Sequence, residues 1–114
     1  MRKIEKQMIE VITLFKEQAQ KPFFNSNLKW YMGNTQVTCN RREDDKIVTT
    51  VYLHENMIAQ YSGDAWGFKM AGWPTPTTKS RINALSQAFG RDGVYTKKGK
   101  HYSSDTEVNA CDWF

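Results

Sequence analysis

Hydrophobic residues near the N-terminus recur at the spacing of one face of an α-helix. Apolar positions three and four residues apart form a single stripe, so a helix is predicted over residues 4–20. Pro22 follows shortly afterwards, and the predicted helix ends before it because proline cannot continue a helix. The stripe consists of Ile4, Met8, Val11, Ile12 and Phe15.

Between residues 30 and 70 the pattern changes to short strands joined by tight turns. Trp66, Phe68 and Met70 occupy alternate positions, which predicts a strand with one buried face. Connections this short favour an antiparallel meander. The predicted strands are 30–32, 36–40, 47–54, 57–61 and 66–70, and the predicted turns are 33–34, 44–45, 55–56 and 62–64.

A second helix is predicted to begin at Thr75-Pro76 and to end before Gly90. Threonine can cap the unpaired N–H groups, and proline at the first helical position gives up a donor that has no partner there. Glycine supplies the left-handed residue that often follows a helix. A last hairpin is predicted to pair residues 94–97 with 100–103. The predicted buried stripe of the helix is Ile82, Leu85, Ala88 and Phe89.

These elements predict an α+β fold, with an N-terminal helix, an antiparallel β-meander, a second helix and a C-terminal hairpin. The 114 residues contain no repeat and no linker, so residues 1–114 are predicted to form a single domain. Hydrophobic residues make up 39% of the chain, which is enough for one core. No apolar run approaches the roughly 18 residues of a membrane span, so a cytoplasmic protein without a membrane partner is expected.

Nothing in the sequence has the spacing of a catalytic or metal site. Cys39 and Cys111 lie far apart and are expected to be reduced thiols, and neither histidine has ligand spacing with them. Cys39 with a distant histidine remains an alternative nucleophile and base, although a small buried thiol on a strand is favoured. The chain is therefore predicted to be no enzyme and to use no cofactor and no metal.

Positive charge is concentrated between residues 79 and 100, within a net charge of +4. This segment would suit nucleic-acid phosphates, and two tyrosines add aromatic faces on which bases could stack. The alternative is a solvated helix face followed by a turn that lysines protect from aggregation. The predicted nucleic-acid or partner-binding residues are Lys79, Arg81, Arg91, Tyr95, Lys97, Lys98, Lys100 and Tyr102.

Two aromatic segments are candidate anchors for a partner. The acidic C-terminal tail ends in Asp112, Trp113 and Phe114, and it resembles loosely the partner-docking tips of single-stranded-DNA-binding proteins. The favoured alternative is that these residues dock on the chain's own core. Trp73, which precedes Pro74, would suit an interface, but it is expected to cover the core.

Two further stretches resemble a pattern found in small proteins of tailed bacteriophages. The first stretch, residues 51–59, is Val-Tyr-Leu-His-Glu-Asn-Met-Ile-Ala, and the second, residues 71–85, is Ala-Gly-Trp-Pro-Thr-Pro-Thr-Thr-Lys-Ser-Arg-Ile-Asn-Ala-Leu. The chain departs from the pattern at Glu55, where glycine is usual, and at Ile82, where leucine is usual. The resemblance implies a phage origin, and it carries no activity and no site residue over to this chain.

Three functions stay open at this point. The first is a non-catalytic phage accessory protein that binds and modulates a host or phage macromolecule, with a host bacterial protein as the favoured partner. The second is a nucleic-acid-binding module that uses residues 79–100. The third is a small hydrolase or nuclease, which ranks last because the sequence has no cluster of carboxylates or histidines.

Overall fold

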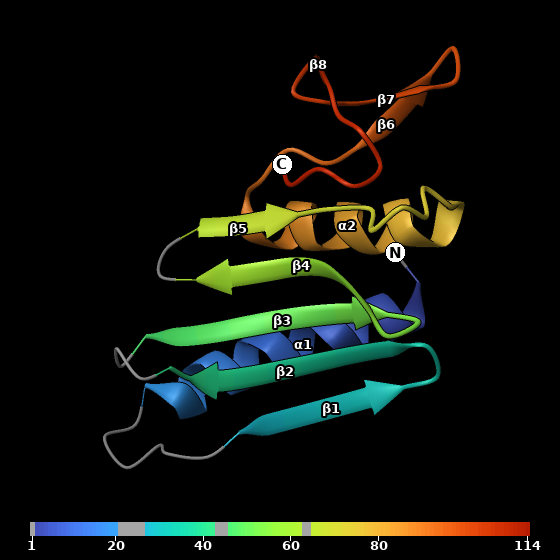
Figure 1. The fold of residues 1–114 in the computed structure, drawn as a ribbon. Coiled ribbons are helices and arrows are strands. Elements are labelled where there is room, and N and C mark those ends of the chain that lie inside the picture. The colour runs from blue at the N-terminus through green and yellow to red at the C-terminus, as the bar shows by residue number, and fades with distance from the viewer. Residues whose placement is uncertain (1, 21–26, 43–45, 63–64) are drawn as a thin grey trace.

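The structure is a computed structural model that describes residues 2–20, 27–42, 46–62 and 65–114 (Figure 1). It confirms the predicted α+β fold and adds one short strand, β8, that the sequence did not reveal. Pro22, the predicted turn 44–45 and residues 63–64 of the predicted turn 62–64 lie outside the described residues. The elements are α1 (Lys3–Ala19), β1 (Leu28–Met32), β2 (Thr35–Arg41), β3 (Ile47–Leu53), β4 (Asn56–Ser62), β5 (Ala65–Phe68), α2 (Pro76–Phe89), β6 (Tyr95–Lys97), β7 (Lys100–Ser103) and β8 (Thr106–Glu107).

The strands form two antiparallel sheets. The larger sheet has the order β1-β2-β3-β4-β5, as expected of a meander, and the smaller sheet has the order β6-β7-β8. In Figure 1, α1 lies behind the larger sheet, α2 lies beside β4 and β5, and the smaller sheet projects beyond α2. The molecule is consequently elongated, with extents of 50 × 28 × 23 Å.

The turns of the larger sheet show why its register is fixed. Gly33 has a φ of 58°, which suits the first position of a two-residue hairpin turn. The next such turn consists of His54 and Glu55, both with positive φ, and not of Glu55 and Asn56 as predicted. Asn56 already belongs to β4, and its side-chain amide donates to the His54 carbonyl at 3.2 Å. Asn56 therefore stabilises the turn from within β4, which explains why the turn lies one residue earlier than predicted.

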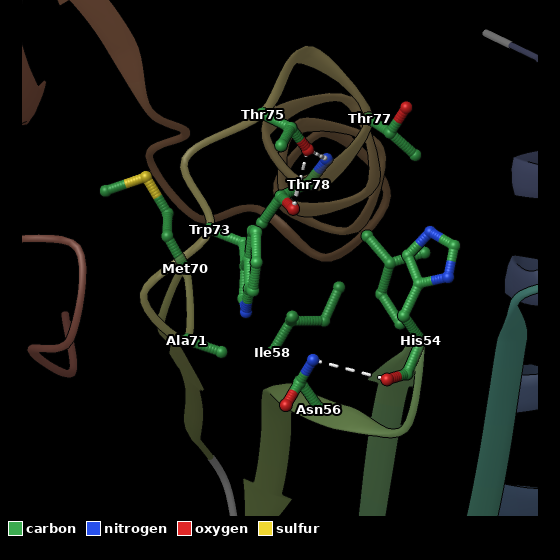
Figure 2. Close-up of a pocket in the computed structure, with 10 residues that line it drawn as sticks. His54, Asn56, Ile58, Met70, Ala71, Trp73, Thr75, Thr77 and Thr78 are labelled. Atoms are coloured by element: carbon green, nitrogen blue, oxygen red, sulfur yellow. Dashed lines mark hydrogen bonds between the residues drawn. The ribbon is translucent and has the colours of Figure 1, made fainter.

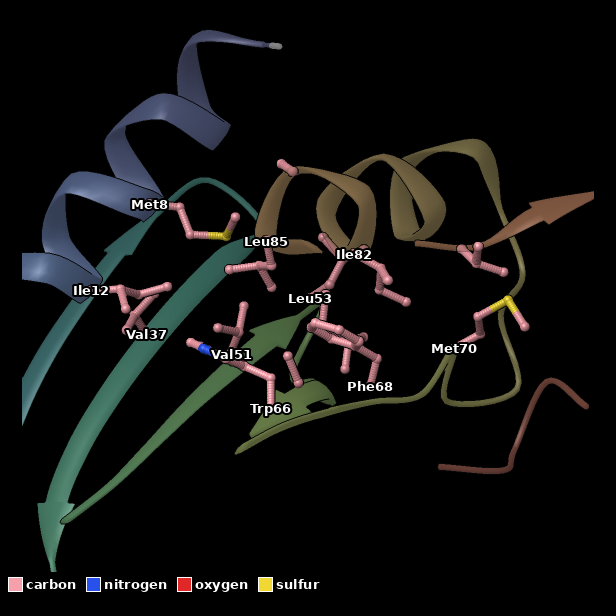
Figure 3. Packing of buried hydrophobic residues seen from close by; sticks show 14 residues of the cluster. Met8, Ile12, Val37, Val51, Leu53, Trp66, Phe68, Met70, Ile82 and Leu85 are labelled. Atoms are coloured by element: carbon pink, nitrogen blue, oxygen red, sulfur yellow. The ribbon is translucent and has the colours of Figure 1, made fainter. Parts of the chain in front are cut away.

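Both helices pack their apolar residues into one core with the sheet (Figure 3). Met8 and Ile12 of the predicted α1 stripe are fully buried, and the rest of that stripe is half-buried. The predicted shared core is also present, because Trp66, Phe68, Ile82 and Leu85 are all buried in one cluster. Phe89 is half-buried and stacks on Trp66, with the ring centroids 5.1 Å apart.

The ends of α2 are as predicted. The Thr75 side chain accepts from the Thr78 N–H at 3.2 Å, and Pro76 occupies the first turn. Gly90 has a φ of 74°, the left-handed conformation expected after the helix. Capping and termination signals in the sequence therefore placed this helix correctly.

The C-terminus closes one edge of the larger sheet. Phe68 of β5 and Phe114 exchange two backbone hydrogen bonds, each 2.8 Å long. The Phe114 ring packs against the core, with its centroid 6.1 Å from that of Phe68. The favoured alternative for the tail is therefore the one that the structure shows: the last residue docks on the chain's own sheet.

Candidate binding surface

The predicted basic surface is divided in the structure, because Arg81 is buried. The residue is 3% exposed, and Nη1 donates to Glu5 Oε2 at 2.7 Å while Nε donates to Thr35 Oγ1 at 3.1 Å. This buried position does not support the prediction that Arg81 contacts a nucleic acid or partner. A guanidinium that joins α1, β2 and α2 inside the molecule is not accessible to a phosphate.

Glu5 is the other half of this internal ion pair, and it is 1% exposed. Its carboxylate also accepts from Ser80 Oγ at 2.6 Å and from the Arg2 backbone N–H at 3.1 Å. Burial alone would raise the pKa of Glu5, but the hydrogen bonds from Ser80, Arg2 and Arg81 outweigh it and hold the pKa below its usual range. Glu5 and Arg81 therefore stabilise the fold and do not form a surface site.

Two other predicted basic residues also have partners within the protein. Arg91 Nη1 donates to the Trp66 carbonyl, and Lys79 Nζ donates to Thr96 Oγ1 at 2.7 Å. Lys97, Lys98 and Lys100 remain exposed around the turn between β6 and β7. Of the predicted basic residues, these three lysines thus lie together at one hairpin tip, defined here as the basic hairpin (residues 95–103).

The two predicted tyrosines lie together on the basic hairpin. Tyr95 and Tyr102 face each other across the β6–β7 pair, and their rings stack with centroids 5.6 Å apart. Tyr95 also donates its hydroxyl to Asp105 at 2.9 Å, and this hydrogen bond raises the pKa of Tyr95. An acid of the C-terminal segment therefore contacts a tyrosine of the hairpin.

The other predicted tail residues are held against the sheet. The Trp113 ring lies so close to Gly67 that a Cβ on this glycine would approach it to 3.2 Å. Lys69 Nζ lies 4.8 Å from the Trp113 ring centroid, and Asp112 accepts from the Asn109 amide at 3.0 Å. Asp112, Trp113 and Phe114 thus form contacts within the chain.

Trp73, which was expected to cover the core, is 63% exposed. It borders a hollow of about 530 Å³ between the β3–β4 turn and the start of α2. Figure 2 shows Trp73 and His54 on opposite sides of this hollow, with Ile58 between them. Leu53, Met70 and Ala71 complete its apolar part, and Asn56, Thr75, Thr77 and Thr78 add polar groups. We call this site the Trp73 hollow.

The backbone around Trp73 is fixed in a way that keeps the indole at the surface. Ala71 and Gly72 both have left-handed backbones, with φ of 56° and 78°. The Trp73 N–H donates to the Met70 carbonyl at 2.9 Å, and the Gly72 N–H donates to the Ala110 carbonyl at 2.9 Å. A left-handed alanine costs on the order of 1 kcal/mol, which these hydrogen bonds help to offset. The loop that carries Trp73 is therefore held in place by hydrogen bonds at Gly72 and Trp73, and we call it the braced loop.

A second hollow, of about 520 Å³, lies on the other side of His54. It is bordered by Tyr31, which is 70% exposed, and by the residues of the β1–β2 turn. Tyr31 and Trp73 are the two most exposed large hydrophobic side chains of the described residues. Among the residues that line either hollow, only His54 and Glu55 can carry a charge.

The two stretches that carry the phage resemblance meet at the Trp73 hollow. The first stretch supplies His54 and the second supplies Trp73, although 19 positions separate them in the chain. Glu55, one of the two departures from the pattern, has a φ of 67°. Glycine would adopt this left-handed conformation without strain.

Two chemistries considered for the sequence, metal binding and a cysteine nucleophile, can be compared with the described residues. No group of three or more His, Cys, Asp or Glu side chains in these parts is arranged to hold a metal ion. Cys39 is buried beside Thr49, and burial raises the pKa of its thiol, which disfavours the reactive thiolate. None of the described helices has both the length and the apolar character required to cross a membrane.

Comparison with known proteins settles the origin of the chain. The Kyanoviridae Gp96 protein family matches residues 1–114. The chain belongs to this family. It is therefore a phage protein, as the resemblance of the two stretches implied. Searches of curated proteins and of solved structures gave no match.

Proposed function

We propose that this Kyanoviridae Gp96 family member is a non-catalytic accessory protein that binds a host bacterial protein through the Trp73 hollow. The observation that carries the proposal is the 63% exposure of Trp73 beside an apolar hollow. An indole left in water loses the free energy that burial would provide, and tryptophan is enriched among the residues that dominate interface energetics. The braced loop lowers the entropy that Trp73 loses on binding.

The composition of the hollow favours a protein partner over a nucleic acid. Binding to nucleic acid depends on Lys and Arg contacts with phosphates, and neither hollow is lined by Lys or Arg among the described residues. An apolar side chain of a partner would instead fill the space between Trp73 and His54. The hydroxyl of Thr77 would be available to orient the partner's backbone.

Nucleic-acid binding by the basic hairpin is the second candidate. It is supported by three exposed lysines at one tip and by the stacked pair Tyr95 and Tyr102 beside them. We place it second because Tyr95 already contacts Asp105, and because Arg81, Arg91 and Lys79 do not add free charge to this tip. In either case the protein would act in the cytoplasm of the infected bacterium without a cofactor.

A capture experiment separates the two candidates. Tagged protein is incubated with lysate of the infected bacterium, with and without nuclease, and the bound material is analysed. We expect one protein to be captured regardless of nuclease, to be lost with Trp73→Ala, and to be kept with Trp113→Ala. Trp113 is a matched control because it is also an exposed tryptophan, at 47%. Capture that nuclease abolishes, and that Trp73→Ala leaves intact, would contradict the proposal.

A further inference from the structure

The two edges of the larger sheet differ in whether their backbone groups are used. The β5 edge pairs with Phe114 through two backbone hydrogen bonds. At the other edge, no strand within the described part of the chain pairs with the outer side of β1. Unpaired edge strands are ready templates for another strand, and proteins usually protect them with charge, proline or a bulge.

The β1 strand has little of this protection. All five of its residues are in register with β2, with no bulge, and Lys29 is its only charged residue. Tyr31 is 70% exposed and Met32 is 44% exposed, while Trp30 is half-buried against the core. Apolar area therefore remains open along this edge, on both faces of the strand.

The hairpin geometry shows which backbone groups are free to pair. In an antiparallel hairpin closed by a two-residue turn, the flanking residues Met32 and Thr35 form a hydrogen-bonded pair, and bonded and non-bonded pairs alternate from there. Lys29 and Tyr31 consequently occupy non-bonded positions in the pairing with β2. Their N–H and C=O groups point outward, away from β2.

We propose that two copies of this chain pair through β1, antiparallel, about a two-fold axis at Trp30. In this register Lys29 of each copy lies opposite Tyr31 of the other, so the outward N–H and C=O groups of both residues form four hydrogen bonds across the axis. Leu28 lies opposite Met32 of the second copy. The two five-stranded sheets join into one continuous sheet.

The side chains of β1 are complementary to themselves in this register. The Lys29 ammonium lies beside the Tyr31 ring of the second copy, which gives a cation–π contact on the open face of the sheet. The two Trp30 residues meet at a non-bonded pair, where facing side chains approach most closely and aromatic pairs stabilise a sheet. A copy of β1 therefore satisfies both faces of the strand at once.

The two neighbouring registers would be less stable, so the register centred on Trp30 is preferred. Centring the axis on Lys29 would place the two lysines directly opposite each other, where like charges are destabilising. Centring it on Tyr31 would place Lys29 opposite Gly33, beyond the end of the strand. Only the Trp30-centred register uses the whole strand in both copies. The proposed dimer leaves the Trp73 hollow open, because no residue of β1 lines it.

Sedimentation of the full chain over a range of concentrations tests this dimer. The parent mass should rise from 13.3 kDa towards twice that value as the concentration increases. Tyr31→Lys places two lysine pairs across the axis and should weaken dimerisation by about tenfold or more. The double variant Lys29→Glu with Tyr31→Lys replaces these pairs with two opposite-charge pairs, and it should restore the dimer.

Gln60→Lys is the matched control, because it adds the same charge to the same sheet face on β4, away from the edge. It should dimerise as the parent does. Circular dichroism confirms that each variant is folded. A parent that stays monomeric at all concentrations, a Tyr31→Lys variant that dimerises normally, or a folded double variant that fails to recover would each overturn the proposal.

Discussion

The Trp73 hollow and the basic hairpin are both exposed, but different parts of the fold support them. The hollow lies directly on the core, because Ile58 and Met70, which line it, are buried. The start of α2 also lines the hollow. The basic hairpin belongs to a separate three-stranded sheet that projects beyond α2 (Figure 1). A rigid apolar site is suited to shape recognition, whereas a projecting charged tip is suited to electrostatic contact. The distribution of charge in the sequence would by itself favour the basic hairpin, which is the second candidate for binding.

The largest expected effect concerns Arg81, a basic residue that lies buried between α1, β2 and α2 and not on the basic hairpin. Arg81→Ala should lower the free energy of unfolding by about 3–5 kcal/mol, because it leaves the buried Glu5 carboxylate without its partner. Lys79→Ala, on the same helix, removes a side chain that donates to Thr96 and should change it by less than about 0.5 kcal/mol. Chemical denaturation measures both. Equal small effects would mean that Arg81 is not held as described.

The pH dependence of the same ion pair provides a second way to test it. The pKa of Glu5 is lowered in the folded state, so its contribution to stability is fully present above the pKa of an unfolded glutamate, about 4.3. That contribution is lost as the pH falls through the lower, folded-state pKa. We expect the parent to lose more stability on acidification than Glu5→Gln does. Parallel stability curves for the two proteins would contradict this.

The core between α2 and the larger sheet should give the next largest effect. Leu85 is fully buried between α2 and the sheet, and Leu85→Ala should cost about 2–5 kcal/mol of unfolding free energy. Gln87→Ala, at an exposed position of the same helix, is the control and should be nearly neutral. A loss well below 1 kcal/mol for Leu85→Ala would show that α2 does not pack as described.

Removing the tail tests whether it belongs to the sheet or screens the basic hairpin. Deleting residues 112–114 removes the two backbone hydrogen bonds of Phe114 and its ring contact, and it should cost about 2 kcal/mol. We expect no tightening of nucleic-acid binding. A truncated protein with unchanged stability and tighter binding at low salt would instead support a tail that competes with phosphates for the lysines.

The smallest effect on stability is expected at the basic hairpin itself. Replacing Lys97, Lys98 and Lys100 by alanine should change the free energy of unfolding by less than about 0.5 kcal/mol, because all three are exposed. If the second candidate function holds, the same variant lowers the salt slope of nucleic-acid binding by up to about three. A salt titration that shows no slope for the parent would remove that candidate.

Local signals in the sequence were sufficient for most of the fold. Thr75-Pro76 and Gly90 placed α2 because capping depends on neighbouring residues, and alternation identified the buried face that includes Trp66 and Phe68. The β3–β4 turn lies one residue earlier than predicted because His54, and not Asn56, adopts a left-handed backbone there, while Asn56 bonds to the turn from β4. Nothing in the composition of residues 106–107 distinguishes β8 from a turn.

The site was harder to predict because it depends on contacts that are distant in the sequence. The sequence alone places Arg81 on the surface because its partner, Glu5, lies 76 residues away and is not signalled by any local pattern. Trp73 was assigned to the core because tryptophan is usually buried, although Pro74 and Pro76 beside it also fitted an interface loop. Its exposure follows from the left-handed Ala71 and Gly72 backbones, and an alanine in that conformation gives no signal in the sequence.

Site-specific photocrosslinking in the infected bacterium tests most directly whether the Trp73 hollow holds a protein partner. A photoreactive amino acid replaces Thr77, which lines the hollow, or Lys98, which lies at the hairpin turn. We predict that position 77 crosslinks one protein, that Trp73→Ala abolishes this crosslink, and that position 98 gives no comparable product. A crosslink to nucleic acid from position 98, with none from position 77, would contradict the account.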